Sequence, residues 1–104
     1  MLLRHATPAR NLPSILRLGL LTRHSRGKLP AVWACSLARS WWAVRHVVKR
    51  HGGRVERTVV LEIDVPRSWL RRNRKGLWYA PRDLPPGRIR RVLTFHELAG
   101  SPAA

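Results

Sequence analysis

The sequence predicts an α+β fold in a single compact domain over residues 1–99, followed by a loose C-terminal tail over residues 100–104. Segments with strand-like alternation are mixed with segments at helical spacing, and no regular strand–helix–strand rhythm runs through the chain. The length of 104 residues is typical of one domain. The apolar share of 44% is enough for one modest core and too high for a disordered basic tail.

The first part of the chain predicts a short strand and then a helix. Residues 2–6 are mostly apolar and predict the strand, which ends at Thr7. The helix covers residues 11–19, because Asn11 can cap it and Gly19 suits the left-handed residue that closes it. Apolar side chains share one face of this helix, and we expect burial of Leu12, Ile15 and Leu16.

A second short apolar strand is expected over residues 31–35, with a longer helix after it. Ser36 is a candidate cap for this helix, and Gly52-Gly53 ends it. Apolar residues recur at helical spacing between these points. They predict a buried stripe of Leu37, Trp41, Val44 and Val48, widened by Trp42 and Val47.

The rest of the chain predicts three more strands. Residues 58–65 alternate clearly, and Pro66 ends that strand. Residues 67–75 form a basic turn or short helix, and residues 77–80 form the next strand. A Pro-Pro-Gly turn at 85–87 then leads to a final strand over 89–95.

The charge is strongly positive, with 21 Lys and Arg against 5 Asp and Glu, a formal net charge of +16. A genome rich in G and C would explain the preference for Arg over Lys, but not this excess of positive charge. A polyanionic partner explains it better, because Arg pairs with phosphate and stacks on bases. An acidic protein partner and a merely solvated basic surface stay open as alternatives. The expected nucleic-acid contacts are Arg39, Arg45, Lys49, Arg50, Arg71, Arg72 and Arg74.

Several classes of protein are disfavoured by the sequence. No apolar run approaches the roughly 18 residues of a membrane span, and charged residues interrupt any signal-peptide core, so a soluble cytoplasmic protein is expected. The single Cys35 excludes an internal disulfide, and we expect it to be a small buried strand residue rather than a nucleophile. The histidines lack metal-ligand spacing, and no metal site is expected.

Three blocks of the sequence resemble the ADP-ribosyltransferase superfamily. Residues 3–7 (Leu-Arg-His-Ala-Thr), 11–16 (Asn-Leu-Pro-Ser-Ile-Leu) and the Gly-Leu at 19–20 are similar to its first motif. Residues 31–36 (Ala-Val-Trp-Ala-Cys-Ser) resemble its second strand and the start of the following helix. Residues 77–86 are similar to the late strand and turn of the DNA-modifying toxin and RNA 2′-phosphotransferase branches. The resemblance spans nearly the whole chain and implies the superfamily's split-sheet fold.

This resemblance implies NAD as cofactor, held in a cleft near His5 and Trp33, which are the candidate catalytic residues. His5 matches the first-motif histidine, which in the family hydrogen-bonds the ribose hydroxyls of NAD. Trp33 stands at the family's second-motif aromatic position, where a ring can stack on nicotinamide. Both residues also have a purely structural interpretation: His5 could hydrogen-bond the backbone at the end of a strand, and Trp33 could pack in the core. The other NAD-binding residues that we expect are Arg4, Thr7, Arg26 and Ser36.

The sequence departs from the family at its catalytic Glu, whose position falls on Leu77 or Trp78. Loss of such a stabilising group typically costs about 3 kcal/mol of transition-state stabilisation. The RNA 2′-phosphotransferase branch works without this Glu, using Arg and His residues to engage a phosphate. Three functions therefore stay open: altered ADP-ribosyl transfer to nucleic acid, an RNA 2′-phosphotransferase-like activity, and a non-catalytic nucleic-acid-binding module. An acidic group facing His5 and Trp33 would favour an enzyme, and the candidates are Glu62, Asp64 and Glu97.

Overall fold

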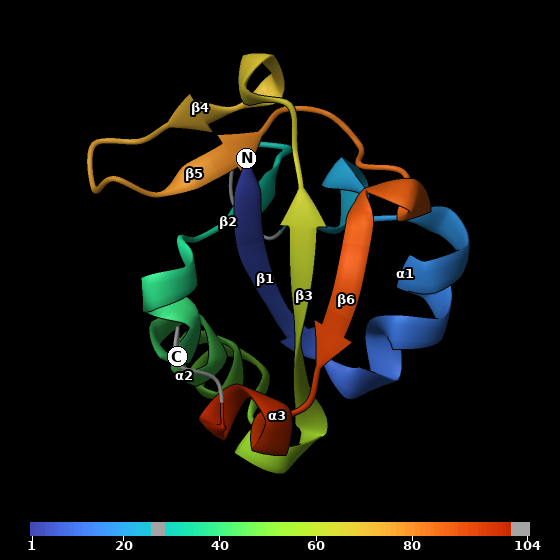
Figure 1. Ribbon diagram of the computed structural model, residues 1–104, viewed down its shortest axis with the longest axis vertical. Coiled ribbons are helices and arrows are strands. Elements are labelled where there is room, and N and C mark those ends of the chain that lie inside the picture. Colours follow the sequence, from blue (N-terminus) through green and yellow to red (C-terminus); the bar gives the residue numbers. More distant parts are fainter. Residues whose placement is uncertain (26–28, 101–104) are drawn as a thin grey trace.

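The strands form two three-stranded antiparallel sheets that adjoin at β1 (Figure 1). The computed structural model of the protein describes residues 1–25 and 29–100. The first sheet has the order β1-β3-β6, with β1 at Leu2–Pro8, β3 at Thr58–Asp64 and β6 at Ile89–Leu93. The second has the order β2-β5-β4, with β2 at Val32–Ala34, β5 at Trp78–Ala80 and β4 at Arg71–Arg72. The helices of the described residues are α1 (Leu12–Leu18), α2 (Ser40–His51) and α3 (Phe95–Ala99). The predicted α+β class is confirmed.

The two sheets are joined by one pair of backbone hydrogen bonds between Arg4 and Cys35. Each residue donates its N–H to the other's carbonyl, and both N···O distances are 2.9 Å. β1 is therefore paired with β3 along one edge and touches the second sheet along the other. This junction brings His5 of β1 next to Trp33 of β2.

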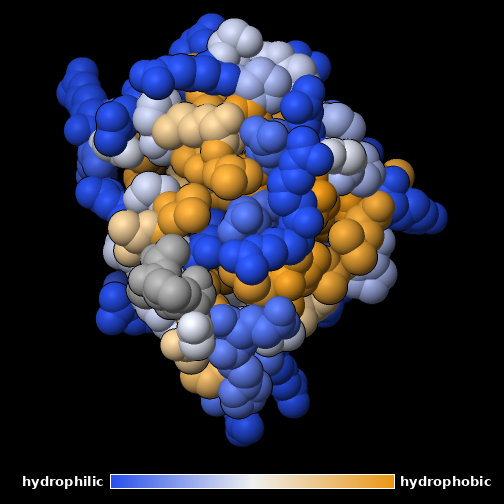
Figure 2. Space-filling view, viewed as in Figure 1, coloured by the Kyte–Doolittle hydropathy of each residue, from blue (hydrophilic) through white to orange (hydrophobic). Residues whose placement is uncertain are grey.

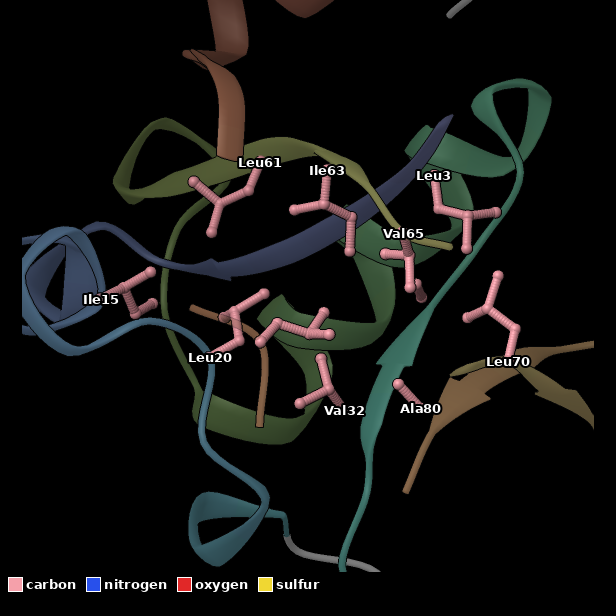
Figure 3. Close-up of a cluster of buried hydrophobic side chains, with 11 residues drawn as sticks. Leu3, Ile15, Leu20, Val32, Leu61, Ile63, Val65, Leu70 and Ala80 are labelled. Carbon is pink, nitrogen blue, oxygen red and sulfur yellow. The ribbon is translucent and has the colours of Figure 1, made fainter. Parts of the chain in front are cut away.

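The first sheet has an apolar cluster on each face. Strand alternation turns Leu3, Leu61 and Ile63 toward one cluster, which also holds Ile15 of α1 and Val32 of β2 (Figure 3). The opposite face presents Val60 and Leu93 to α2 and α3. Because helices cover both faces, β3 is buried along most of its length. The outline of the molecule carries many projecting hydrophilic side chains (Figure 2).

The short helix α1 buries less of its predicted face than expected. Ile15 is buried and Leu12 is half-buried, but Leu16 is 50% exposed, so the prediction for Leu16 was wrong. A helix of seven residues makes only two turns, and α1 meets the core along the single row that contains Ile15.

The helix α2 begins later than predicted. Residues Leu37–Arg39 form a 3₁₀ turn, and the side chain of Ser36 makes no capping hydrogen bond. Ser40 starts α2 instead, and its hydroxyl donates to the carbonyl of Leu37 across 2.6 Å. Gly52 ends α2 in the left-handed conformation, as predicted.

One strand and one helix were not predicted. Residues 67–75 were expected to form only a basic turn or short helix, but β4 lies within them after a 3₁₀ turn at Arg67–Trp69. The final strand ends at Leu93 rather than at residue 95, and α3 follows. A capping box starts it: the Thr94 hydroxyl accepts from the Glu97 N–H at 3.2 Å, while the Glu97 carboxylate accepts from the Thr94 N–H at 3.3 Å. The sequence Thr-Phe-His-Glu at residues 94–97 fits the capping-box pattern and could have predicted the start of α3.

Candidate functional site

A pocket of about 990 Å³ opens at the junction of the two sheets. β1 and β2 contribute backbone and side chains to it, α2 forms one side, and the turn between β4 and β5 adds residues 73–75 and 77. This volume lies at the upper end of the usual range for small-molecule sites. Its polar and aromatic lining residues are Arg4, His5, Thr7, Asn11, Ser14, His24, Ser25, Trp33, Trp42, His46, Arg50, His51, Asn73, Arg74 and Lys75.

His5 is held in a defined orientation within this pocket. Its Nδ1 lies 2.6 Å from the backbone carbonyl oxygen of Trp33. A carbonyl oxygen only accepts, so Nδ1 carries the hydrogen and donates it. In the neutral imidazole this leaves Nε2 with a lone pair, ready to accept a hydrogen bond from a hydroxyl.

Burial lowers the pKa of His5 below its usual 6.5, and the hydrogen bond to Trp33 opposes this shift only in part. The imidazole is therefore neutral at physiological pH. A neutral histidine with a fixed tautomer is a hydrogen-bond acceptor or a general base at Nε2, not a cation for binding phosphate.

The lowered pKa gives a testable pH dependence of stability. Just below pH 6.5 the unfolded chain binds a proton at His5 that the folded chain does not, so the free energy of unfolding decreases there as the pH is lowered. We expect His5→Gln to flatten this dependence just below pH 6.5. Urea denaturation at several pH values measures it. His96→Gln, at an exposed position on α3, is the control. A slope that His5→Gln leaves unchanged would contradict the assignment.

Trp33 is half-buried, and it both lines the pocket and packs against a second aromatic ring. Its ring centroid lies 4.9 Å from that of Tyr79, with the planes tilted by 38°. The two residues are register partners on β2 and β5. Trp33 therefore packs against Tyr79, as a core residue would, and it also lines the pocket.

The other residues expected to bind NAD have different positions. Thr7 is buried beside the pocket, and its hydroxyl accepts from the amide of Asn11 across 3.2 Å. Ser36 is not among the lining residues. Arg26 lies outside the described residues.

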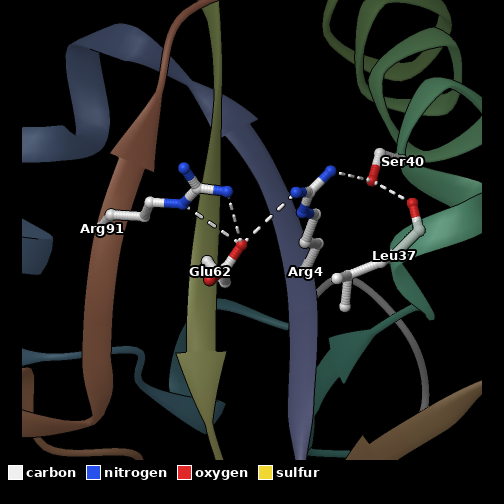
Figure 4. Close-up of polar contacts among 5 residues, drawn as sticks. All are labelled: Arg4, Leu37, Ser40, Glu62 and Arg91. Carbon is white, nitrogen blue, oxygen red and sulfur yellow. Dashed lines mark hydrogen bonds and ion pairs between the residues drawn. The ribbon is translucent and has the colours of Figure 1, made fainter. Parts of the chain in front are cut away.

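The Arg4 guanidinium is engaged in a buried network (Figure 4). Its Nη1 donates to the Ser40 hydroxyl across 2.9 Å, and its Nη2 lies 3.3 Å from a carboxylate oxygen of Glu62. The same oxygen also accepts from Arg91 across 3.2 Å. Arg4 is only 1% exposed, so its charge connects β1, β3 and α2 and is not offered to a ligand at the surface.

No carboxylate lines the part of the pocket that the structure describes. Leu77 lies in the lining at the family's Glu position, whereas Trp78 packs against the first cluster. The three acidic candidates have other partners: Glu62 pairs with Arg4 and Arg91, Asp64 with Arg90, and Glu97 belongs to the capping box.

Basic residues supply the charge of the pocket. Arg50 of α2 and the adjacent Arg74 and Lys75 line it. The other expected nucleic-acid residues lie elsewhere on the surface. Arg71 bonds the backbone carbonyl of Leu70, and the guanidinium of Arg72 lies 4.8 Å from the Trp78 ring centroid. Arg39, Arg45 and Lys49 are exposed on or next to α2.

The aromatic part of the pocket wall on α2 was not predicted from the sequence. Trp42, which was expected in the buried stripe, is 43% exposed and lines the pocket. Its ring stacks on that of His46, with centroids 5.3 Å apart and planes 15° from parallel. The spacing of Trp42, His46 and Arg50 by four residues was the signal, since such residues share one helix face.

Cys35 also lines the pocket but is unsuited to nucleophilic attack. Burial raises the pKa of its thiol to about 11, so the thiolate is scarce at neutral pH. Over residues 1–25 and 29–100, no three histidine, cysteine or acidic side chains are placed to bind a metal ion. No helix in those same ranges is long and apolar enough to cross a membrane.

No model of a protein family matches this chain, and no curated protein is significantly similar to it.

Proposed function

We propose that this protein is ADP-ribosyltransferase-like, binds NAD in the pocket at the sheet junction, and acts on nucleic acid. The observation that carries the proposal is the fixed tautomer of His5, which leaves its Nε2 able to accept a hydrogen bond. His5 lines a pocket that is large enough for a dinucleotide. Neutral acceptors of this kind suit the paired hydroxyls of a ribose.

The remaining lining suits the other parts of NAD. The Trp33 ring offers an apolar face for a planar nicotinamide. Arg50, Arg74 and Lys75 offer positive charge for a pyrophosphate. When bound, NAD supplies an activated ribose carbon for transfer. The chain's own residues orient it, with His5 accepting from a hydroxyl and the cations offsetting the phosphate charge.

The carboxylate-free lining favours a second candidate function, an RNA 2′-phosphotransferase-like activity. A phosphate acceptor is already anionic at neutral pH and needs no carboxylate base to activate it. It would be attracted by the basic residues that line the pocket. Both candidates use the same pocket and the same role for His5.

Calorimetric titration with NAD tests the proposal. We expect measurable binding at submillimolar NAD and a loss of at least about tenfold in affinity for His5→Ala, since a hydrogen bond inside a pocket is worth about 1.5 kcal/mol. His96→Ala, on exposed α3, should bind like the unmodified chain. Absence of heat at millimolar NAD, or equal affinity for His5→Ala, would remove NAD binding at this pocket.

A further inference from the structure

The outward face of α2 combines an exposed aromatic pair with positive charge. Trp42 keeps 43% of its surface exposed, and its ring is stacked on His46. Arg45, Lys49 and Arg50 are exposed on the same helix. No acidic residue occurs between residues 1 and 55, so no carboxylate within α2 neutralises this face.

Packing of α2 against the core does not account for Trp42. The core contact is made by Val44, which is 2% exposed, and by Trp41 and Val48. The Trp41 ring meets the edge of Phe95 with centroids 5.5 Å apart. Trp42 lies on another side of the helix, where it covers none of these residues. A tryptophan held in solvent beside positive charges is typical of surfaces that bind nucleic acid.

The aromatic pair is continuous with the pocket. Trp42, His46 and Arg50 of α2 line it, and so does His5 of β1. Successive helical residues rise by about 1.5 Å, so the step from Trp42 to Arg50 covers about 12 Å. A polynucleotide that follows α2 would thus run along the edge of the pocket.

We propose that the outward face of α2 binds a single-stranded nucleic acid, with one unpaired base on the Trp42–His46 pair and phosphates near Arg45, Lys49 and Arg50. The positive charge of Arg45, Lys49 and Arg50 favours binding of a polyanion. The exposed Trp42 ring favours a polyanion whose bases are free to stack on it. In a duplex the base faces are stacked inside the helix and unavailable to Trp42. This inference rests on the proposed function, since it names the form of the nucleic acid that reaches the pocket.

Fluorescence anisotropy with a labelled mixed-sequence DNA of 12 nucleotides, alone and as a duplex, tests the proposal. The single strand should bind more tightly than the duplex, and Trp42→Ala should weaken its binding about tenfold, as expected for the loss of one stacked base. Inorganic polyphosphate, a polyanion without bases, should bind the unmodified chain and Trp42→Ala with equal affinity. Trp42 is exposed, so the variant is expected to fold, which circular dichroism verifies.

The phosphate contacts are tested by Arg45→Gln combined with Lys49→Gln. Each phosphate contact to a single strand contributes about 0.7 to the slope of log affinity against log salt, so this pair should reduce the slope by about 1.4. The matched control is Arg17→Gln with Arg67→Gln, which removes equal charge from exposed residues outside α2. The control slope should stay close to that of the unmodified chain.

The proposal is overturned by equal losses in the two double variants, by equal affinity for duplex and single strand, or by unchanged DNA affinity in Trp42→Ala. If Trp42→Ala loses affinity for NAD alone, the ring belongs to the cofactor and the proposal fails. Calorimetry with NAD on the same proteins separates the two ideas. If the protein does not bind NAD but gives the expected DNA results, the proposed function is refuted. The proposal that α2 binds a single strand then still stands.

Discussion

Replacing Gly19 with alanine is expected to destabilise the protein by about 4 kcal/mol, from backbone strain and from disrupted hydrogen bonds. Gly19 follows α1 with φ 87° and ψ −170°, a conformation that is essentially restricted to glycine. An alanine Cβ at this position would overlap the backbone carbonyl oxygen of Leu84. Either the chain after α1 or the segment around Leu84 must move.

That overlap acts on a pairing that fastens two distant segments. Leu20 and Leu84 exchange both backbone hydrogen bonds, each with an N···O distance of 2.9 Å. Their side chains are 5% and 2% exposed within the first apolar cluster. Displacing the Leu84 carbonyl therefore costs hydrogen bonds and core packing together. A domain of this size has about 5–15 kcal/mol of stability in total, so the loss is severe.

Urea denaturation of Gly19→Ala against two other glycine variants measures the effect. Gly53→Ala should be close to neutral, because its Cβ meets nothing within 4 Å and its φ is not positive. Gly52→Ala should cost about 1 kcal/mol, because Gly52 has φ 65° but open space around its Cβ. A loss at Gly19 no larger than at Gly52 would show that the segment around Leu84 relaxes freely.

Local signals in the sequence predicted the C-terminal ends of α1 and α2 and the strand β3, but the predicted cap of α1 was wrong, because the Asn11 side chain makes no capping hydrogen bond. Gly52 ends α2 in the predicted left-handed conformation, whereas Gly19 ends α1 with positive φ but an extended ψ of −170°. The alternation over residues 58–65 likewise predicted β3, since period-two patterning is a property of the strand itself. The start of α2 was less predictable, because Ser36 fits a cap by residue type, yet α2 begins at Ser40 with Arg39 at its cap position. The Ser40 hydroxyl is bound by Arg4 of a distant strand, a contact that local sequence does not reveal.

Long-range partners explain what could not be predicted about the site. The residues His5 and Trp33 were predicted to lie together, and the Arg4–Cys35 bridge places them so. That Arg4 would turn away to Glu62 depends on the register of β1 against β3, which pairs these two residues. The exposure of Trp42 depends on which helix face meets the sheet, and both Trp41 and Trp42 fitted the predicted stripe.

Replacing Glu62 with alanine is expected to cost about 3 kcal/mol, because it leaves the buried Arg4 charge without a counter-ion. Arg4 is 1% exposed and Glu62 is 12% exposed, so water reaches this pair poorly. The Nε of Arg4 has no hydrogen-bond partner in the described part of the chain, so the guanidinium depends on its remaining contacts. Arg91→Ala should cost less than about 1 kcal/mol, because Arg91 is 54% exposed and binds the same carboxylate from the solvent side.

Replacing both partners at once separates the strength of this pair from the penalty of breaking it. Arg4→Met with Glu62→Leu removes both charges and fills the space with apolar groups, and it should recover most of the loss seen in Glu62→Ala. Ser40 stays satisfied in that variant, because its hydroxyl donates to Leu37. A double variant as unstable as Glu62→Ala would mean that the geometry of the pair, rather than its charge balance, holds α2 against β1. Recovery would mean that Glu62, one of five acidic residues in the chain, mainly neutralises a buried arginine. Measured unfolding free energies at neutral pH and fixed salt distinguish these outcomes.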